Sequence, residues 1–407
     1  MYSILQGIRV IEGSAFVAAP LGGMSLAQLG ADVIRFDQIG GGLDYRRWPV
    51  TKDGNSIYWT SLNRGKRSIA IDLRNQEGKE LVQALITEQD EKAGVFLTNF
   101  PSRGWSSYES LSTIRSDLIQ INIEGNNDGS SAVDYTVNCA TGLPYITGTA
   151  SSESPVNSTL PSWDVACGLY AALAAVSALL KRQQSGEGTH AKIALSDVAM
   201  TTMGNLGYLS EAQLNERPRE AIGNNLYGAF GRDFPTSDNG RVMIVAITLR
   251  QWQNLVKAAD IEIEIKQLEE QSGLNLDLEG ERYRAHDEIC QLVENWTTSM
   301  TLADLRRTLD EHAVCWGEYQ TMQEMLENDP RCSVENEIFE MINDPLTGEQ
   351  LAPATPIRFQ GETRGSVPGA PLLGQHTNEI LSSVLGLNDS QIGDLHQRGI
   401  VAGLNHG

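Results

Sequence analysis

Short runs of β-branched and aliphatic residues alternate with longer amphipathic stretches along the first 125 residues of the chain. The runs lie at 8–12, 32–36, 94–98 and 118–123. This alternation is typical of βαβ units, in which helices cover a mostly parallel sheet. Ligands of such sheets bind beyond the carboxyl ends of the strands. The sequence therefore predicts an α/β fold with a binding site in the loops that follow these strands.

The strongest helix candidate is the stretch 163–183, which is rich in Ala and Leu and is closed by the segment SGEG at 185–188. A strand at 190–195 is expected to follow it. The elements expected further along are a strand at 241–247, a helix from Leu249 and two short helices near 376–386 and 388–398.

Composition changes near residue 215. Residues 260–345 contain 22 Asp and Glu but only six Lys and Arg, and they carry most of the formal net charge of −21. This region is expected to be a separate, solvated and helical part of the protein.

The acidic balance of the whole chain, 52 Asp and Glu against 31 Lys and Arg, argues against nucleic acid and anionic membranes as partners. No basic segment followed by an apolar core begins the chain, and no run of about 18 apolar residues occurs, so a cytoplasmic location is expected. The five cysteines form no CxxC pair and are expected to be reduced, with Cys139 and Cys167 buried and unreactive. The six histidines form no HExxH pair, so no metal site is predicted.

Seven basic and two acidic residues lie between positions 46 and 74 of this otherwise acidic chain. The basic residues are Arg46, Arg47, Lys52, Arg64, Lys66, Arg67 and Arg74. A solvated loop is the usual explanation of such a cluster. Because arginine forks bind phosphate in a bidentate manner, the segment is also a candidate site for a phosphorylated ligand. Neither a Walker loop nor a GxGxxG motif accompanies it.

Asp164 is the carboxylate that stands out, because it lies just inside the start of the long helix candidate. The free backbone N–H groups and the helix dipole at such a place keep a carboxylate ionised and oriented. Residue type and position favour a helix-capping role beside Ser162. The functional alternative is a nucleophile that attacks an activated acyl group and forms a covalent intermediate. Periodicity does not decide between the two.

Six segments of the chain resemble CoA-transferase family III, the CaiB/BaiF type, and they follow one another in the order of that family. The segments are LQGIRVIEGSAFVAAPLGGMSLAQLGADVIRFD at 5–37, LNRGKRSIAIDLR at 62–74, NF at 99–100, WDVACGLYAALAAV at 163–176, SGEGTHAKIALSD at 185–197 and APLLGQHTNEIL at 370–381. The resemblance implies a Rossmann-like large domain whose parallel sheet is built from both chain ends, a smaller inserted α+β domain, and an interlocked homodimer. The implied boundaries are 1–210 for the first part of the large CoA-binding domain, 211–240 for a linker with a Gly-rich loop, 241–330 for the small domain, and 331–407 for a linker and the C-terminal return to the large domain.

The resemblance also implies roles for single residues. Asp164 matches the nucleophilic aspartate of the family, which takes an acyl group from CoA as a mixed anhydride and then holds CoA as an aspartyl thioester. An acyl-CoA is then the substrate, and no cofactor is bound permanently. The positions that match CoA contacts of the family are Val17, Ala18, Gln38, Ile71, Asp72, Leu73, Arg74, Asn99, Phe100, Pro101, Arg103 and Tyr135.

Substrate contacts are expected close to Asp164. Arg46 or Arg47 is expected to hold a free carboxylate of the substrate, and the apolar Val17 and Ala18 are expected to accept a methyl group. The glycine loop that covers the nucleophile in the family matches loosely at 223–231.

The distinctive stretches EGSAFVAAPLGGM, FDQIGGGLDYRRWPVT, VDYTVN and LYGAFGRDF resemble a branch of the family that moves CoA between the two carboxyls of one methyl-branched dicarboxylate. Transfer to a separate acid, α-methylacyl-CoA racemisation and non-catalytic CoA-ester binding stay open as alternatives. Racemisation lacks a second proton-transfer residue, because Ala132, Val133 and Asp134 stand where the racemase branch has Gly-His-Asp.

Overall fold

The computed structural model describes residues 1–149, 154–215 and 219–404. The chain divides into two compact units. The first comprises Met1–Thr141, Ser158–Glu211 and Pro330–Gly407, and the second comprises Gly142–Asn157 and Ala212–Asp329. The chain thus enters the second unit twice, and the short segment 142–157 belongs to it. The domain boundaries expected at 211, 241 and 331 stay predictions.

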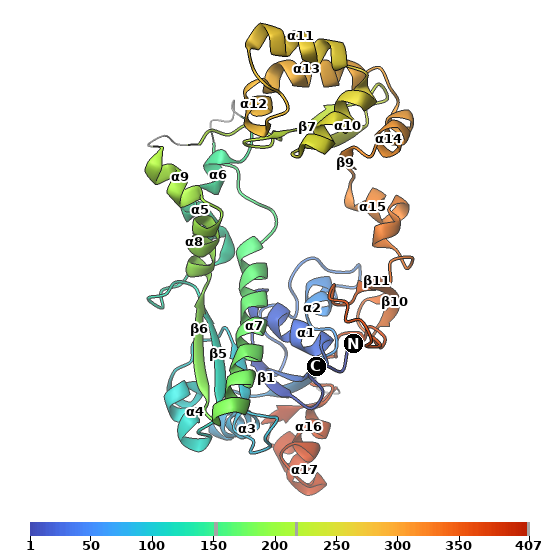
Figure 1. The fold of residues 1–407 in the computed structure, drawn as a ribbon. Helices are drawn as coiled ribbons and strands as arrows, with labels where there is room; N and C mark the ends of the chain where they lie inside the picture. Colours follow the sequence, from blue (N-terminus) through green and yellow to red (C-terminus); the bar gives the residue numbers. More distant parts are fainter. Residues whose placement is uncertain (150–153, 216–218, 405–407) are drawn as a thin grey trace. The chain divides into compact units, whose positions relative to one another are not determined.

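A seven-stranded sheet forms the centre of the first unit (Figure 1). Its strands lie in the order β12-β3-β2-β1-β4-β5-β6, and all neighbours are parallel except β12, which pairs antiparallel with β3 at one edge. Without β12 this is the 3-2-1-4-5-6 order of doubly wound nucleotide-binding sheets. The strands are β1 (Arg9–Gly13), β2 (Asp32–Asp37), β3 (Arg67–Ile71), β4 (Val95–Thr98), β5 (Ile119–Glu124), β6 (Thr189–Ala194) and β12 (Val401–Ala402).

The hydrophobic pattern explains why these segments become strands. The runs predicted at 8–12, 32–36, 94–98 and 118–123 form β1, β2, β4 and β5, and the run at 190–195 forms β6. Side chains such as Ile11, Ile34 and Phe96 are almost completely buried, as expected of strands that are covered on both faces. The predicted α/β fold with a mostly parallel sheet is therefore confirmed.

The basic segment between residues 46 and 74 is not one solvated loop. Its part Arg67–Ile71 forms the buried strand β3, which pairs with β2 on one side and with the C-terminal strand β12 on the other. Ile69 and Ile71 are fully buried, so the apolar residues of this run outweigh the charges beside them. The C-terminal strand also means that both chain ends contribute to the sheet.

Helices cover both faces of the sheet. On one face, α3, α4, α16 and α17 share a hydrophobic core with the strands, and on the other α1 packs beside the long helix α7 (Figure 1). The helices of this unit are α1 (Ala18–Gln28), α2 (Ile57–Leu62), α3 (Gln76–Ile86), α4 (Tyr108–Ile114), α5 (Asp134–Ala140), α7 (Ser162–Ser185), α8 (Leu195–Asn205), α16 (Thr377–Ser383) and α17 (Asp389–Gln397). Two short 3₁₀ turns at Gly104–Ser106 and Pro330–Cys332 and a hairpin of β10 (Phe339–Asp344) and β11 (Gly348–Pro353) complete it.

The long helix α7 confirms the helix predicted at 163–183. It ends at Gly186, whose φ of 72° lies in the left-handed region and whose N–H donates to the carbonyl of Arg182. By length and composition alone α7 could cross a membrane. In the structure it is a core helix of the first unit, with Ala171 and Ala175 fully buried.

Glycines allow α1 and α7 to approach closely. A Cβ added to Gly168 of α7 would lie 2.6 Å from the carbonyl oxygen of Ala18, and one added to Gly22 of α1 would lie 3.0 Å from the carbonyl oxygen of Gly168. Such contacts with backbone atoms cannot be relieved by a side-chain rotation. The two glycines therefore set the spacing between the start of α1 and the first turns of α7.

The second unit contains an antiparallel sheet of β7 (Phe230–Pro235), β8 (Arg241–Ala246) and β9 (Cys315–Glu318). Phe230, Phe234 and Trp252 pack in its core. The helices of this unit are α6 (Leu143–Ile146), α10 (Leu249–Ala259), α11 (Glu262–Ser272), α12 (Glu279–Arg284), α13 (His286–Thr297), α14 (Leu302–Glu311) and α15 (Met322–Asn328), and α9 (Tyr208–Leu214) lies where the chain passes from the first unit to the second.

The composition predicted that the acidic region 260–345 is a separate helical part, and this prediction is wrong. Its helices share the second unit with the three-stranded sheet, and its last residues belong to the first unit, where they form β10. Apolar residues at helical spacing, such as Ile289 and Val293, join the core of that sheet, whereas most acidic residues of these helices are exposed. The strand at 241–247 and the helix from Leu249 are confirmed as β8 and α10.

Replacing Gly168 by Ala should destabilise the protein, because the added methyl group collides with the backbone of α1. Overpacking of this kind costs about 1–3 kcal/mol in the free energy of unfolding. Gly393→Ala on the exposed face of helix α17 is the matched control, since a Cβ there meets no atom within 4 Å, and helix propensity should make it neutral or stabilising. Denaturant unfolding of both variants measures the difference, and equal stabilities would contradict the close α1–α7 contact.

Candidate active site

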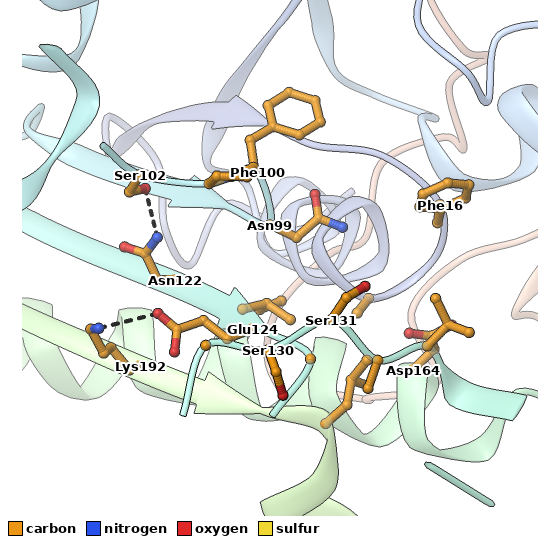
Figure 2. Close-up of a pocket in the computed structure, with 18 of the residues that line it drawn as sticks. Phe16, Asn99, Phe100, Ser102, Asn122, Glu124, Ser130, Ser131, Asp164 and Lys192 are labelled. Atoms are coloured by element: carbon orange, nitrogen blue, oxygen red, sulfur yellow. Dashed lines mark hydrogen bonds and ion pairs between the residues drawn. The ribbon is translucent and has the colours of Figure 1, made fainter. Parts of the chain in front are cut away.

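A cavity of about 800 Å³ lies in the first unit beside the carboxyl ends of β1, β4 and β5. Much of its wall comes from residues 16–18 after β1, residues 99–103 after β4 and most of the segment 122–135, from the end of β5 to the start of α5. Between β1 and β4 the strand order reverses, which is the usual ligand-binding place of such sheets. The structure therefore has a cavity where the strand pattern predicts a binding site. Figure 2 shows Phe16, Asn99 and Asp164 around it.

Asp164 lies in the first turn of α7 and lines this cavity. The capping role that its position favoured belongs to another residue. The carboxylate oxygen Oδ2 of Asp134 accepts hydrogen bonds from the backbone N–H groups of Trp163 (2.7 Å) and Asp164 (3.1 Å). Among the described residues, no hydrogen bond is donated to the carboxylate of Asp164. This carboxylate is therefore free to react with a ligand in the cavity.

The surroundings of Asp164 raise the pKa of its carboxyl group to about 6. Burial is the main cause, and the negative charge of Asp134 adds to it, whereas the positive charge of Arg47 opposes it. At neutral pH the group is mostly ionised but more basic than an exposed aspartate. This combination is what a carboxylate nucleophile requires.

Arg47 is held between two aromatic rings at the edge of the cavity. Its guanidinium carbon lies 5.2 Å from the ring centroid of Phe16 and 5.3 Å from that of Tyr58. Burial raises the pKa of Tyr58 to about 12, so its phenol stays neutral. Two cation–π contacts orient a cation without consuming its hydrogen-bond donors. The guanidinium can thus bind an anionic group in the cavity.

The loop between β1 and α1 is fixed by Asn99. The side-chain amide of Asn99 accepts a hydrogen bond from the N–H of Ala15 (2.9 Å) and donates one to the carbonyl of Ala15 (2.7 Å). The next residue, Phe16, has a φ of 67°, a left-handed conformation that costs a non-glycine residue about 1–3 kcal/mol. The Asn99 bonds help to keep this strained loop, and with it the Phe16 ring, in place.

A buried charge network lies on β1, β2 and the residues around them. Arg35 is fully buried and donates to the carboxylates of Asp37 and Asp44 and to the carbonyl of Ser14. Lys66 is buried as well and donates to Glu12 at 2.8 Å, while burial lowers the pKa of Lys66 to about 8. The network holds the start of the loop between β1 and α1 in a fixed position on the sheet.

The basic cluster of the sequence is not a phosphate site made of seven cations. Lys66 forms an ion pair with Glu12 in the core, and Arg67 forms ion pairs with Asp32 and Glu379 on neighbouring elements. Arg64 is buried outside the cavity, and Arg74 pairs with Asp72 on the surface. Of the cluster, only Arg47 lines the cavity.

The structure brings together most of the residues expected at the site. Those that line the cavity are Val17, Ala18, Arg47, Asn99, Phe100, Pro101, Arg103, Tyr135 and Asp164. Those outside its wall are Gln38, Arg46, Ile71, Asp72, Leu73 and Arg74. Gln38 is exposed and donates to the carbonyl of Gly41, and the side chain of Ile71 is fully buried, so only the backbone of Ile71 could face a ligand. The glycine loop at 223–231 belongs to the second unit and runs into β7.

Several residues of the site were missed from the sequence. Phe16 and Tyr58 hold Arg47, and Asp134 caps α7. The wall between Asn122 and Val133 was missed as well, although the turn-forming run GNNDGSS after a predicted strand is a signal that could have indicated it. No local pattern connects Asp134 with the start of α7, because 30 residues separate Asp134 and Asp164.

The two cysteines expected to be buried, Cys139 and Cys167, differ in their exposure to solvent. Cys167 is fully buried, and burial together with the charge of Asp164 raises the pKa of its thiol to about 12, so it is unreactive as predicted. Cys139 is exposed on α5, and the prediction for it is wrong. It falls on the outer face of a short helix, where small neighbours in the sequence do not imply burial.

Comparison with known proteins assigns the chain to a family. Residues 5–377 match the model of CoA-transferase family III, and the chain belongs to this family. It is therefore an enzyme that acts on CoA thioesters.

Curated relatives cover the whole chain. The 2-methylfumaryl-CoA isomerase of Chloroflexus aurantiacus is 52% identical over 404 residues, which is 99% of each chain. The Succinyl-CoA--D-citramalate CoA-transferase of the same organism is 29% identical over 407 residues and 98% of each chain.

Solved structures share the fold. A CaiB/BaiF family protein from Brucella suis has a TM-score of 0.77 at 25% identity and covers 94% of this chain and 100% of its own. A hypothetical protein from Mycobacterium tuberculosis has a TM-score of 0.74 at 22% identity, covers 92% of this chain and 98% of its own, and supports the fold alone.

Proposed function

We propose that this protein is a 2-methylfumaryl-CoA isomerase, which moves CoA from the C1 to the C4 carboxyl of mesaconyl-CoA and forms 3-methylfumaryl-CoA. The full-length similarity to the isomerase of Chloroflexus aurantiacus supports this activity. The structural observation that carries the proposal is the carboxylate of Asp164, which lines the cavity without being used as a helix cap.

The reaction proceeds through four acyl transfers at Asp164. A carboxylate oxygen of Asp164 attacks the C1 thioester carbonyl, and the C–S bond breaks to give a mixed anhydride and CoA thiolate. The thiolate attacks the aspartyl carbonyl, which gives an aspartyl-CoA thioester and frees the dicarboxylate. The C4 carboxylate then attacks this thioester and expels the thiolate, which finally attacks the C4 carbonyl and releases Asp164. Atoms balance without water and without net proton transfer.

The environment of Asp164 suits these steps. Its pKa of about 6 leaves the carboxylate ionised at neutral pH, as attack on a thioester requires. Burial also keeps bulk water from the anhydride, which would otherwise hydrolyse. A cavity of about 800 Å³ has room for a thioester with its dicarboxylate head.

We assign substrate and CoA contacts as follows. Arg47 binds the free carboxylate of the substrate, since it lines the cavity whereas Arg46 does not, and Val17 and Ala18 accept the methyl group. The thioester end of CoA contacts the residues Asn99, Phe100, Pro101, Arg103 and Tyr135. The adenine end extends outward over the loops after β2 and β3, to Gln38 and to residues 71–74.

We also propose that the protein is an interlocked homodimer with a Rossmann-like large domain and a small inserted domain. An apolar stripe on α7 supports the contact with a second copy. Leu169, Leu173, Val176 and Leu180 lie at helical spacing and are 38–60% exposed. An unpartnered stripe of this kind marks an interaction surface.

Asp164→Asn should lower turnover by at least about a thousandfold, because the amide is not a nucleophile. Binding of a CoA thioester, measured by calorimetry, should stay close to that of the unchanged protein. Asp389→Asn is the matched control, an exposed aspartate in the first turn of α17 outside the cavity, and it should keep full activity. A fully active Asp164→Asn protein would remove the covalent route.

Arg47→Ala should raise KM for the dicarboxyl thioester by about tenfold or more, because a charge-assisted hydrogen bond to the free carboxylate is lost. A CoA ester of a monocarboxylic acid should bind equally well to the variant and the unchanged protein. Arg46→Ala is the comparison, with the same loss of charge next to the cavity but not in its wall. Equal kinetics of both variants would place the carboxylate elsewhere.

Intramolecular transfer is distinguished from transfer to a separate acid by isotope dilution. Carbon-13-labelled mesaconyl-CoA is incubated with a large excess of unlabelled mesaconate, and the product thioester is analysed by mass spectrometry. Retention of the label is expected, because the freed dicarboxylate stays in the cavity until its second carboxylate reacts. Dilution of the label would support intermolecular transfer. A racemase is tested with a saturated 2-methylacyl-CoA, because mesaconyl-CoA has no hydrogen on its α-carbon, and deuterium uptake at the α-carbon of that ester in heavy water would support racemisation.

A further inference from the structure

Asp134 makes an unusual contact for a residue that touches the cavity wall. It is the first residue of α5, only 3% of it is exposed, and its carboxylate does not cap its own helix. Instead Oδ2 accepts two backbone N–H groups at the start of α7, from Trp163 and Asp164. A buried carboxylate with two backbone donors is an expensive arrangement unless these bonds are kept.

A second bond joins the same two helices. The indole Nε1 of Trp163 donates to the side-chain oxygen of Asn138 at 3.0 Å, and Trp163 is 6% exposed. Asn138 lies one turn after Asp134 on α5, so the two bonds hold the start of α7 at two points on one face of α5. The first turn of α7 cannot rotate without breaking both.

This arrangement has two consequences for Asp164. Helix N-termini leave backbone donors that an aspartate in the first turn could satisfy with its own carboxylate. Asp134 satisfies the donors of Trp163 and Asp164, so the Asp164 side chain does not turn back onto the helix. The negative charge of Asp134 also lies beside that of Asp164, and like charges at short range disfavour ionisation.

We propose that Asp134 is a positioning residue for Asp164, which takes over the capping of α7, leaves the Asp164 carboxylate free for covalent chemistry, and strengthens that carboxylate as a nucleophile through its own charge. The proposal rests on the role of Asp164 in the proposed function. It assigns no contact between Asp134 and the reacting atoms.

The groups that face Asp164 allow the charge effect to be measured. They are Arg47, Tyr58 on α2, Asp134 on α5 and Cys167 on α7 itself. Tyr58 and Cys167 have a pKa raised to about 12, and arginine does not titrate, so none of these three changes charge between pH 5 and 9. His190 lines a distant part of the cavity wall, on β6, and its titration is common to the unchanged protein and any variant of Asp134.

Asp134→Asn separates capping from charge. The amide oxygen can accept the same backbone N–H groups, but the side chain is neutral. The unchanged protein should lose kcat/KM as the pH falls through about 6, where Asp164 becomes protonated. In the variant Asp164 loses its proton more easily, so this acidic limb should move to lower pH, while kcat at pH 8 falls about two- to threefold because a less basic carboxylate attacks more slowly.

Asp134→Ser is the second variant, since a serine hydroxyl also caps helices without charge, and it should show the same shift. Asp389→Asn, which removes an exposed helix-start carboxylate outside the cavity, should leave the limb in place. Melting temperatures report on capping alone. A purely structural role of Asp134 predicts an unchanged limb in both folded variants, and that result would overturn the proposal. It differs from failure of the proposed function, in which Asp164→Asn itself stays active.

Discussion

The site depends on one buried interaction, the acceptance of two α7 backbone N–H groups by the carboxylate of Asp134. It fixes the first turn of a 24-residue helix that packs along the sheet and closely against α1. Because the contact between Gly168 and Ala18 sets that spacing, α7 positions both Asp164 and the loop between β1 and α1. The position of α7 thus sets the distance between Asp164 and the loop between β1 and α1.

Ion pairs inside the protein determine which cationic side chains stay available to bind a substrate. Positive charges near the site are abundant in the sequence, yet Arg35 and Lys66 are used inside the protein by Glu12, Asp37 and Asp44. These ion pairs are buried, so breaking one leaves an uncompensated charge, and the network is fixed for that reason. Arg47 differs, because aromatic rings hold it and leave its donors free. Arg103 also lies in the wall of the cavity, so the cavity offers cationic donors to an anionic ligand.

The sequence predicts the parts of this structure that local patterns encode. The strands follow from runs of apolar residues. Helix α7 follows from its Ala- and Leu-rich composition and from the glycine after its last turn. What it does not predict depends on pairs far apart in the chain. The capping role expected of Asp164 is filled by a residue 30 positions earlier. The sequence does not show that Lys66 and Arg67 of the basic cluster form ion pairs, because their partners Glu12, Asp32 and Glu379 come from other elements. The chemistry of Asp164 was suggested by family resemblance, since periodicity cannot separate a cap from a nucleophile.

Intramolecular and intermolecular transfer share every covalent step, so the difference between them lies in how long the freed acid stays bound. In the proposed mechanism, once CoA is on Asp164 the freed dicarboxylate carries two charges and must present its second carboxylate before it leaves. An anchor such as Arg47 slows departure, and a cavity of about 800 Å³ leaves room for the acid to turn. The retention of the freed acid and the space in which it turns both depend on the residues of the cavity wall, not on Asp164. In the proposed mechanism the outcome therefore depends on the residues around Asp164 more than on Asp164 itself.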